Sequence, residues 1–110
     1  MTLDDLIAYG ADVETGLQRC MGSEAIYLKL VETVKEEASF GRLEQALDAG
    51  DLDAAFDAAH ALKGVLGNLA LTPLYDPVHE ITELLRSRTE MDYTEQYGKI
   101  NDAWQALRLL

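Results

Sequence analysis

The stretch DLDAAFDAAHALKGVLGNLALTP, residues 51–73, predicts a helix whose beginning and end can both be recognised in the sequence. Asp51 follows Gly50, and this pair is typical of one helix stopping and the next being capped. Thr72 and Pro73 indicate a second boundary, because proline is favoured in the first turn of a helix. Apolar residues recur at intervals of three and four between these boundaries, so this stretch is expected to form one helix that turns sharply into the next.

Toward the N-terminus the same signals predict two short helices. Thr2 is placed to cap the first, and Asp5 completes a capping box with it before Gly10 ends the helix. Asp12 is placed to cap the second short helix, which Gly22 ends. No stretch of the chain alternates apolar and polar residues as a strand would.

Four long helices are expected after the two short ones. Ser23 caps the first, a weak break is expected near residues 39–41, Pro77 is expected to kink or restart the third, and Asp92 caps the last. The expected ranges are about 24–49, 52–69, 73–88 and 92–109. Narrow apolar stripes and short connections predict an all-α fold, an antiparallel four-helix bundle with short N-terminal helices packed across it, in a single domain over residues 1–110.

The chain is strongly acidic, with a net charge of −11 over 110 residues. Such a surface repels phosphate backbones and anionic membranes, so neither nucleic acid nor a membrane is expected as a partner. No apolar stretch approaches the roughly 20 residues that cross a bilayer, and the acidic N-terminus does not resemble a secretory signal. A cytoplasmic location is therefore expected, and Cys20, the single cysteine, is expected to be buried.

The sequence argues against an autonomous enzyme. His60 and His79 are the only histidines, and with the scattered carboxylates they give no metal-ligand spacing. No glycine-rich loop followed by Lys and Ser or Thr is present to bind ATP. We therefore expect no metal and no cofactor.

His60 is predicted to point away from the core. At about 100° per helical residue, the apolar side chains of its helix gather on the opposite side; they are Ala55, Ala59, Leu62, Leu66 and Leu69. A histidine in an apolar helix is commonly a core residue, but this geometry leaves His60 exposed. Taken alone, it would be an ordinary surface histidine.

The residues that follow His60 favour a chemical role. Gly64 and Gly67 lie one and two turns later on the same side, although glycine in a helix interior costs about 1 kcal/mol relative to alanine. Glycine leaves bare backbone, so a bulky group can approach the ring. Lys63 can bring a positive charge to the same space. An exposed nucleophilic imidazole with cleared space and a cation suits a phosphoryl group carried on a ring nitrogen.

The motif AHALKG…NL resembles the signature of histidine phosphotransfer (HPt) domains of multistep phosphorelays, on the residues His60, Leu62, Lys63, Gly64, Asn68 and Leu69. The resemblance implies a four-helix bundle with a phosphorylated histidine exposed in mid-helix and no kinase activity. It implies receiver domains, of a hybrid sensor kinase or a response regulator, as partners that give and take the phosphoryl group. A monomer is expected. Ala70 departs from the pattern, because many relatives have a glycine there.

The resemblance also raises the question of what orients the histidine ring. In the expected hairpin of the second and third long helices, Thr82 and Glu83 reach the level of His60, and Arg86 reaches that of Phe56. Relatives often place a Glu or Gln at the position of Thr82, where it bonds the inner ring nitrogen. Thr82, Glu83 or a water molecule could fill that role here.

Three alternatives remain at this point. His79 also lies off its apolar stripe, but Glu83 follows one turn later, would pair with it and would repel a phosphate. Phe56 is either an exposed anchor for a receiver domain or a side chain covered by Arg86 or by the N-terminal helices. The chain could also be an acidic docking module that accepts no phosphate, a role that would not need the group His60, Lys63 and Gly64.

Overall fold

The structure is a computed structural model that describes residues 1–110, and it contains seven helices and no strand. The prediction of an all-helical chain is confirmed. The helices are α1 (Leu3–Tyr9), α2 (Val13–Arg19), α3 (Glu24–Lys35), α4 (Ser39–Asp48), α5 (Leu52–Asn68), α6 (Thr72–Arg86) and α7 (Thr94–Arg108). None of these helices is both long enough and apolar enough to cross a membrane.

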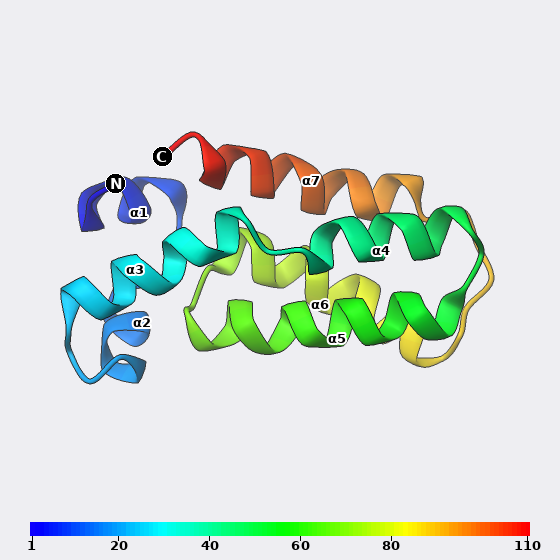
Figure 1. Cartoon of the computed structure of the whole chain (residues 1–110), viewed down its shortest axis with the longest axis horizontal. Coiled ribbons are helices and arrows are strands. Elements are labelled where there is room, and N and C mark those ends of the chain that lie inside the picture. The colour runs from blue at the N-terminus through cyan, green and yellow to red at the C-terminus, as the bar shows by residue number, and fades with distance from the viewer.

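The helices α4 to α7 lie side by side, and successive ones run in opposite directions (Figure 1). α5 packs against both α4 and α6, and α6 also packs against α7. α1, α2 and α3 lie at one end of the molecule, beside the C-terminus. This end-on arrangement gives a body of 41 × 24 × 19 Å, with α5 exposed along its outer side.

The prediction of one long helix over 24–49 is wrong, because the chain breaks at residues 36–38, earlier than the weak break expected. The Glu37 carboxylate accepts hydrogen bonds from the backbone N–H (3.1 Å) and hydroxyl (2.9 Å) of Ser39, the first residue of α4, whose N-cap residue Ala38 offers no side-chain cap. The indole N–H of Trp104 donates to the Val34 carbonyl at 3.0 Å, near the end of α3. Phe40, fully buried, stacks on the Trp104 ring with centroids 4.4 Å apart. The break therefore lies where Trp104 of α7 contacts both the end of α3 and the start of α4.

Other helix boundaries also differ from the expectation: α2 ends at Arg19, before Gly22, and α6 ends at Arg86 and not near residue 88. α6 begins at Thr72 without a side-chain cap and runs without interruption through Pro77. Pro77 lies in the second turn, where it lacks the N–H that would bond the carbonyl of Pro73. α7 begins at Thr94, not at residue 92, because the Asp92 carboxylate bonds the backbone N–H of Thr94 (2.9 Å) and its hydroxyl (2.5 Å).

The core is continuous and takes its α5 residues from the side opposite His60, as predicted. Ala55, Ala59, Leu62 and Leu66 are each 1% exposed or less. Ala70 follows this helix with φ 53°, in the left-handed region where glycine is usual. The chain thus ends α5 with an alanine in the conformation that a glycine would adopt more easily.

The N-terminal helices are fastened to the far end of α5. The Tyr27 hydroxyl donates to the Leu69 carbonyl at 2.9 Å, and the Asp12 backbone N–H donates to the Ala70 carbonyl at 3.0 Å. A Cβ on Gly16 would lie 2.5 Å from the Tyr27 ring, so only glycine lets α2 come this close to α3. Cys20, at the end of α2, is buried as expected. These contacts fix where the last turn of α2 meets α5.

Candidate functional site

His60 lies exposed near the middle of α5, and its ring is supported from one side by Phe56. The two rings stack one turn apart, with centroids 5.5 Å apart and planes inclined by 21°. Phe56 is itself partly buried beneath two guanidinium groups, Arg86 at 5.2 Å and Arg88 at 4.7 Å from the ring centroid. Of the two alternatives for Phe56, the structure shows the one in which arginine side chains cover its ring, so Phe56 is not a freely exposed aromatic anchor. Phe56 stacks on the imidazole of His60 instead.

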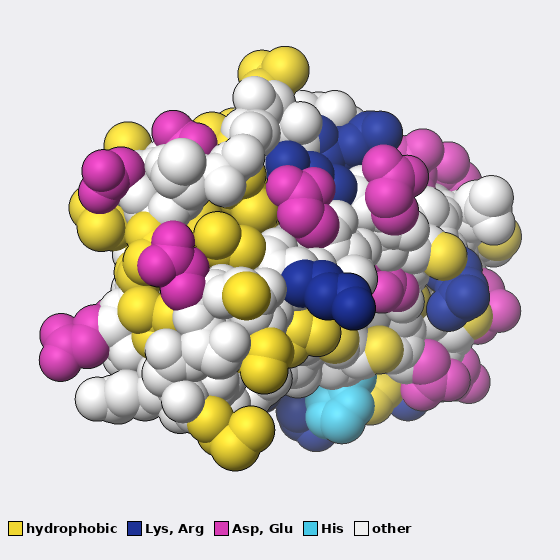
Figure 2. All heavy atoms as spheres, turned by 60° about the vertical axis from the view of Figure 1, so that its left-hand side comes forward, with side chains coloured by type: hydrophobic (Ala, Val, Ile, Leu, Met, Phe, Trp, Pro, Cys, Tyr) yellow, Lys and Arg dark blue, Asp and Glu magenta, His cyan; other side chains and the backbone are white.

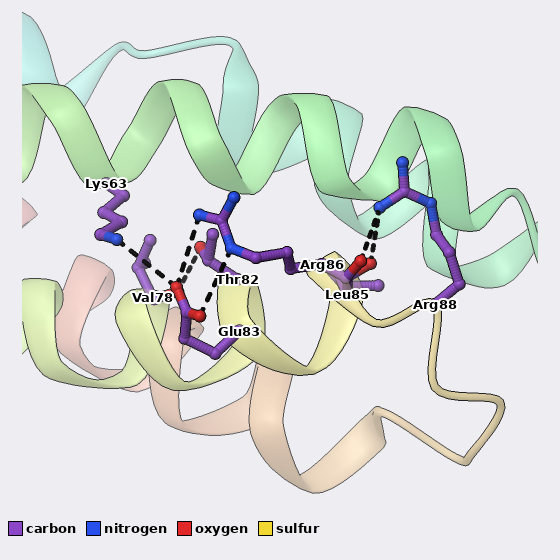
Figure 3. Close-up of polar contacts among 7 residues, drawn as sticks. All are labelled: Lys63, Val78, Thr82, Glu83, Leu85, Arg86 and Arg88. Atoms are coloured by element: carbon purple, nitrogen blue, oxygen red, sulfur yellow. Dashed lines mark hydrogen bonds and ion pairs between the residues drawn. The ribbon is translucent and has the colours of Figure 1, made fainter.

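Lys63 is held beside His60 by an ion pair with α6. Its ammonium lies 3.5 Å from the Glu83 carboxylate, which Arg86 also contacts at 3.4 Å (Figure 3). Hydrogen bonding and charge from Arg86, and then the charge of Lys63, lower the pKa of Glu83 from its ordinary value. Glu83 thus stays ionised and shared between two cations. The expected ion pair of Glu83 with His79 is not formed.

Neither Thr82 nor Glu83 orients the His60 ring through a hydrogen bond. Thr82 is fully buried and its hydroxyl donates to the Val78 carbonyl of its own helix at 2.6 Å (Figure 3). A threonine side chain is short enough to be satisfied within its own helix turn, so it does not reach across to α5. The interpretation of Thr82 as the orienting residue is therefore not supported, and stacking on Phe56 is the contact observed.

The two glycines that follow His60 serve different purposes. A Cβ on Gly64 would meet no atom within 4 Å, so the space beside the ring is open there. A Cβ on Gly67 would lie 3.1 Å from the ring of Tyr75, which belongs to α6. Gly67 therefore makes room for Tyr75 and not for a group approaching His60. Only Gly64 matches the steric argument made from the sequence.

A hollow of about 440 Å³ adjoins His60, and it includes a residue that the sequence did not suggest. Its lining comprises Arg19, His60, Lys63, Gly64, Gly67, Asn68 and Tyr75. Arg19 comes from the last turn of α2 and donates from its guanidinium to the Gly67 carbonyl. No local pattern could indicate this, because Arg19 reads simply as a cation at a helix C-terminus. Only the tertiary contact brings it to the site.

Charges of both signs are spread over the rest of the surface. Figure 2 shows acidic side chains scattered over the face at the N-terminal end, with a histidine at its lower edge next to basic side chains. Hydrophobic side chains are exposed on this end too. The exposed large hydrophobic residues of the N-terminal segment are Ile7, Met21 and Ile26. Two basic residues, Arg19 and Lys63, line the hollow beside His60, although the chain as a whole is acidic.

A comparison with protein families decides the assignment. The model of the Hpt domain matches residues 29–109, which include the whole of α5 and the residues from Lys63 to Asn68. The chain belongs to the Hpt domain family. Neither a curated protein nor a solved structure gives a significant match.

Membership of the Hpt family sets the general function, which is histidine phosphotransfer within a phosphorelay. Hpt domains are phosphocarriers and not kinases, and they interact with receiver domains. α1 and α2 lie outside the residues matched by the Hpt model. Arg19 is therefore a residue of this site that the family comparison does not cover.

Proposed function

We propose that His60 accepts a phosphoryl group from the aspartyl phosphate of one receiver domain and passes it to the aspartate of another. The observation that carries this proposal is the open space at Gly64, one turn after an exposed histidine that stacks on Phe56. We interpret α4 to α7 as an antiparallel four-helix bundle that presents this histidine. The proposal includes a single domain, a monomer, a cytoplasmic location and no cofactor.

The transfer step needs only the imidazole and the approaching phosphoryl group. The unprotonated ring nitrogen of His60 attacks phosphorus, an N–P bond forms, and the P–O bond to the receiver's aspartate breaks. The aspartate leaves as a carboxylate with the bonding electron pair. The other ring nitrogen keeps its proton, so the phosphorylated ring is cationic. In the second half of the relay a carboxylate attacks phosphorus and the N–P electrons return to the ring.

Lys63 and Gly64 support this step in different ways. Lys63, 3.5 Å from Glu83, is close enough to the hollow to turn toward phosphoryl oxygens and offset their charge. The bare backbone at Gly64 leaves a path along which the donor phosphate and the ring nitrogen can align. The geometry thus supports transfer more strongly than docking alone, for which neither feature is needed.

The test compares the two histidines. The parent, His60→Gln and the matched control His79→Gln are incubated with isolated receiver domains that have been phosphorylated by radiolabelled acetyl phosphate. We expect acid-labile, base-stable label on the parent and on the His79 variant, and none on the folded His60 variant. Incubation with labelled ATP should leave all three unlabelled. Binding of a receiver to a parent that never takes label would favour the docking-only alternative.

A further inference from the structure

Arg19 is the basic residue of the hollow that has no carboxylate within ion-pair distance. Lys63 and Arg86 share Glu83, at 3.5 and 3.4 Å, and Arg88 pairs with Asp53 at 2.6 Å. Arg19 forms no ion pair. The acidic group that interacts with Arg19 is Asp12, at the start of the same helix: the charge of Arg19 helps to lower the pKa of Asp12, but the two form no salt bridge. An anion entering the hollow would therefore compete with a contacting carboxylate, Glu83, for Lys63, but only with the longer-range charge of Asp12 for Arg19.

The guanidinium of Arg19 is also held in place. It donates to the Gly67 carbonyl, one turn beyond Gly64 on α5. Its helix is fixed by the hydrogen bond from the Asp12 backbone N–H to the Ala70 carbonyl at 3.0 Å. A guanidinium has five N–H donors in a rigid plane, and its remaining donors make no hydrogen bond within the protein. A fixed planar donor of this kind suits the oxygens of a phosphoryl group.

We propose that Arg19 is a phosphoryl-binding residue: it contacts the oxygens of the group carried on His60 and holds that group over the hollow. This inference rests on the proposed function, and it makes α2 part of the site although α2 lies outside the residues matched by the Hpt model. Arg19 forms no covalent bond and moves no proton. It stabilises the dianionic form of the phosphoryl group and the approach of a phosphoryl donor.

The experiment uses phosphoramidate, a small phosphoryl donor, so that no receiver domain has to dock. The parent, Arg19→Gln, Arg19→Lys and the matched control Arg42→Gln are labelled and followed by ³¹P NMR. Gln retains an N–H donor for the Gly67 carbonyl but removes the charge. Arg42 is an exposed arginine of α4 that also has no ion pair, so its variant changes the net charge equally.

We expect Arg19→Gln to slow labelling about three- to tenfold and to raise the pKa of the phosphoryl group by about half a unit, because a nearby cation favours the dianion. Arg19→Lys should recover most of the pKa change, and Arg42→Gln should match the parent. In the parent itself, the side-chain N–H resonance of Arg19 should shift when His60 is phosphorylated, and that of Arg42 should not. This last measurement does not depend on how well any variant folds.

Several outcomes would overturn the inference. Equal effects of Arg19→Gln and Arg42→Gln would assign the change to net charge, and an Arg19 resonance that ignores phosphorylation would remove the contact. If the parent takes label and Arg19→Gln behaves like it, the role of Arg19 fails while the proposed function stands. If the parent takes no label from phosphoramidate or from any phosphorylated receiver, the proposed function fails first.

Discussion

The surroundings of His60 and His79 differ more than the histidines themselves. Each is exposed and stacks on an aromatic ring one turn earlier, Phe56 at 5.5 Å and Tyr75 at 5.7 Å between centroids. Beside His60 the next turn offers Lys63 and the open backbone of Gly64.

Beside His79 the corresponding space is lined by Glu80 and Glu83, which would repel a phosphate. If His60 alone carries the phosphoryl group, as proposed, an exposed and stacked imidazole is not enough to mark such a site. The charge and the steric access of the following turn distinguish the two. Glu83 belongs to both regions, because it lines the space near His79 and pairs with Lys63.

The largest effect is expected from closing the access to His60. Gly64→Gln should reduce transfer from a phosphorylated receiver by a factor of about a hundred or more, since misplacing the reacting atoms is costly. The same change should preserve or raise thermal stability, because glycine is a poor residue in a helix interior. A melting curve is paired with a transfer rate.

Gly41→Gln is the matched control for Gly64→Gln, because a Cβ on Gly41 also meets no atom within 4 Å but lies on α4, away from the hollow. It should leave transfer unchanged. A Gly64→Gln protein as stable and as active as the parent would remove the distinction in access between the two histidines. If that protein unfolded, Gly64 would have a packing role instead.

A smaller effect is expected from removing the charge that distinguishes His60. Lys63→Ala should slow transfer about ten- to a hundredfold, because a charge-assisted contact is worth about 1.5–3 kcal/mol. Lys99→Ala is the control, since Lys99 also makes an ion pair with α6, to Glu80 at 3.9 Å, but does not line the hollow. Transfer at the parent rate by the Lys63 variant would exclude that lysine from the mechanism.

The smallest effect is expected at the residue that the two regions share. Glu83→Gln should accelerate labelling of His60 by about two- to fivefold, because Lys63 would be released from an exposed ion pair, and such pairs are weak. The lowered pKa of Glu83 means that the carboxylate competes for Lys63 above its unfolded pKa and loses this role only as the pH falls through the lower folded value.

The advantage of the Glu83→Gln variant should consequently persist throughout the neutral range and vanish only in acid, which a pH series of labelling rates would show. Glu80→Gln serves as the control, because Glu80 lies near His79 but pairs with Lys99. Slower labelling by the Glu83 variant would mean that Glu83 positions Lys63 and does not compete for it.

Local signals in the sequence were sufficient for α5 and its exposed histidine. The cap at Asp51 and the recurring apolar positions fixed both the helix and the direction of His60, since helix geometry alone relates them. The break at residues 36–38 was misplaced because its partner Trp104 comes from α7, about seventy positions away. The sequence also did not predict that the buried Thr82 hydroxyl bonds the Val78 carbonyl of its own helix, since this depends on how closely α5 and α6 pack.

The same limit applied to the site. Lys63 and Gly64 could be placed beside His60 from the sequence, because all three lie on one helix. Arg19 reaches the hollow only because α2 folds onto α5. Gly67 looked equivalent to Gly64 in sequence, but the ring of Tyr75 occupies the space next to it. Residue spacing within one helix predicts which side chains share a face of that helix. It does not predict which side chains of other helices will contact that face.

The N-terminal helices are hydrogen-bonded to the end of α5, so the fold includes residues that lie outside the range matched by the Hpt model. A fragment trimmed to residues 29–109 would retain the residues that the Hpt model matches. It would lose Tyr27 and Asp12, and the carbonyls of Leu69 and Ala70 would lose the partners that they have in the intact chain. The turn that carries Ala70 in its left-handed conformation would then be held less firmly. A fragment that starts where the family match starts is therefore expected to be less stable than the intact chain.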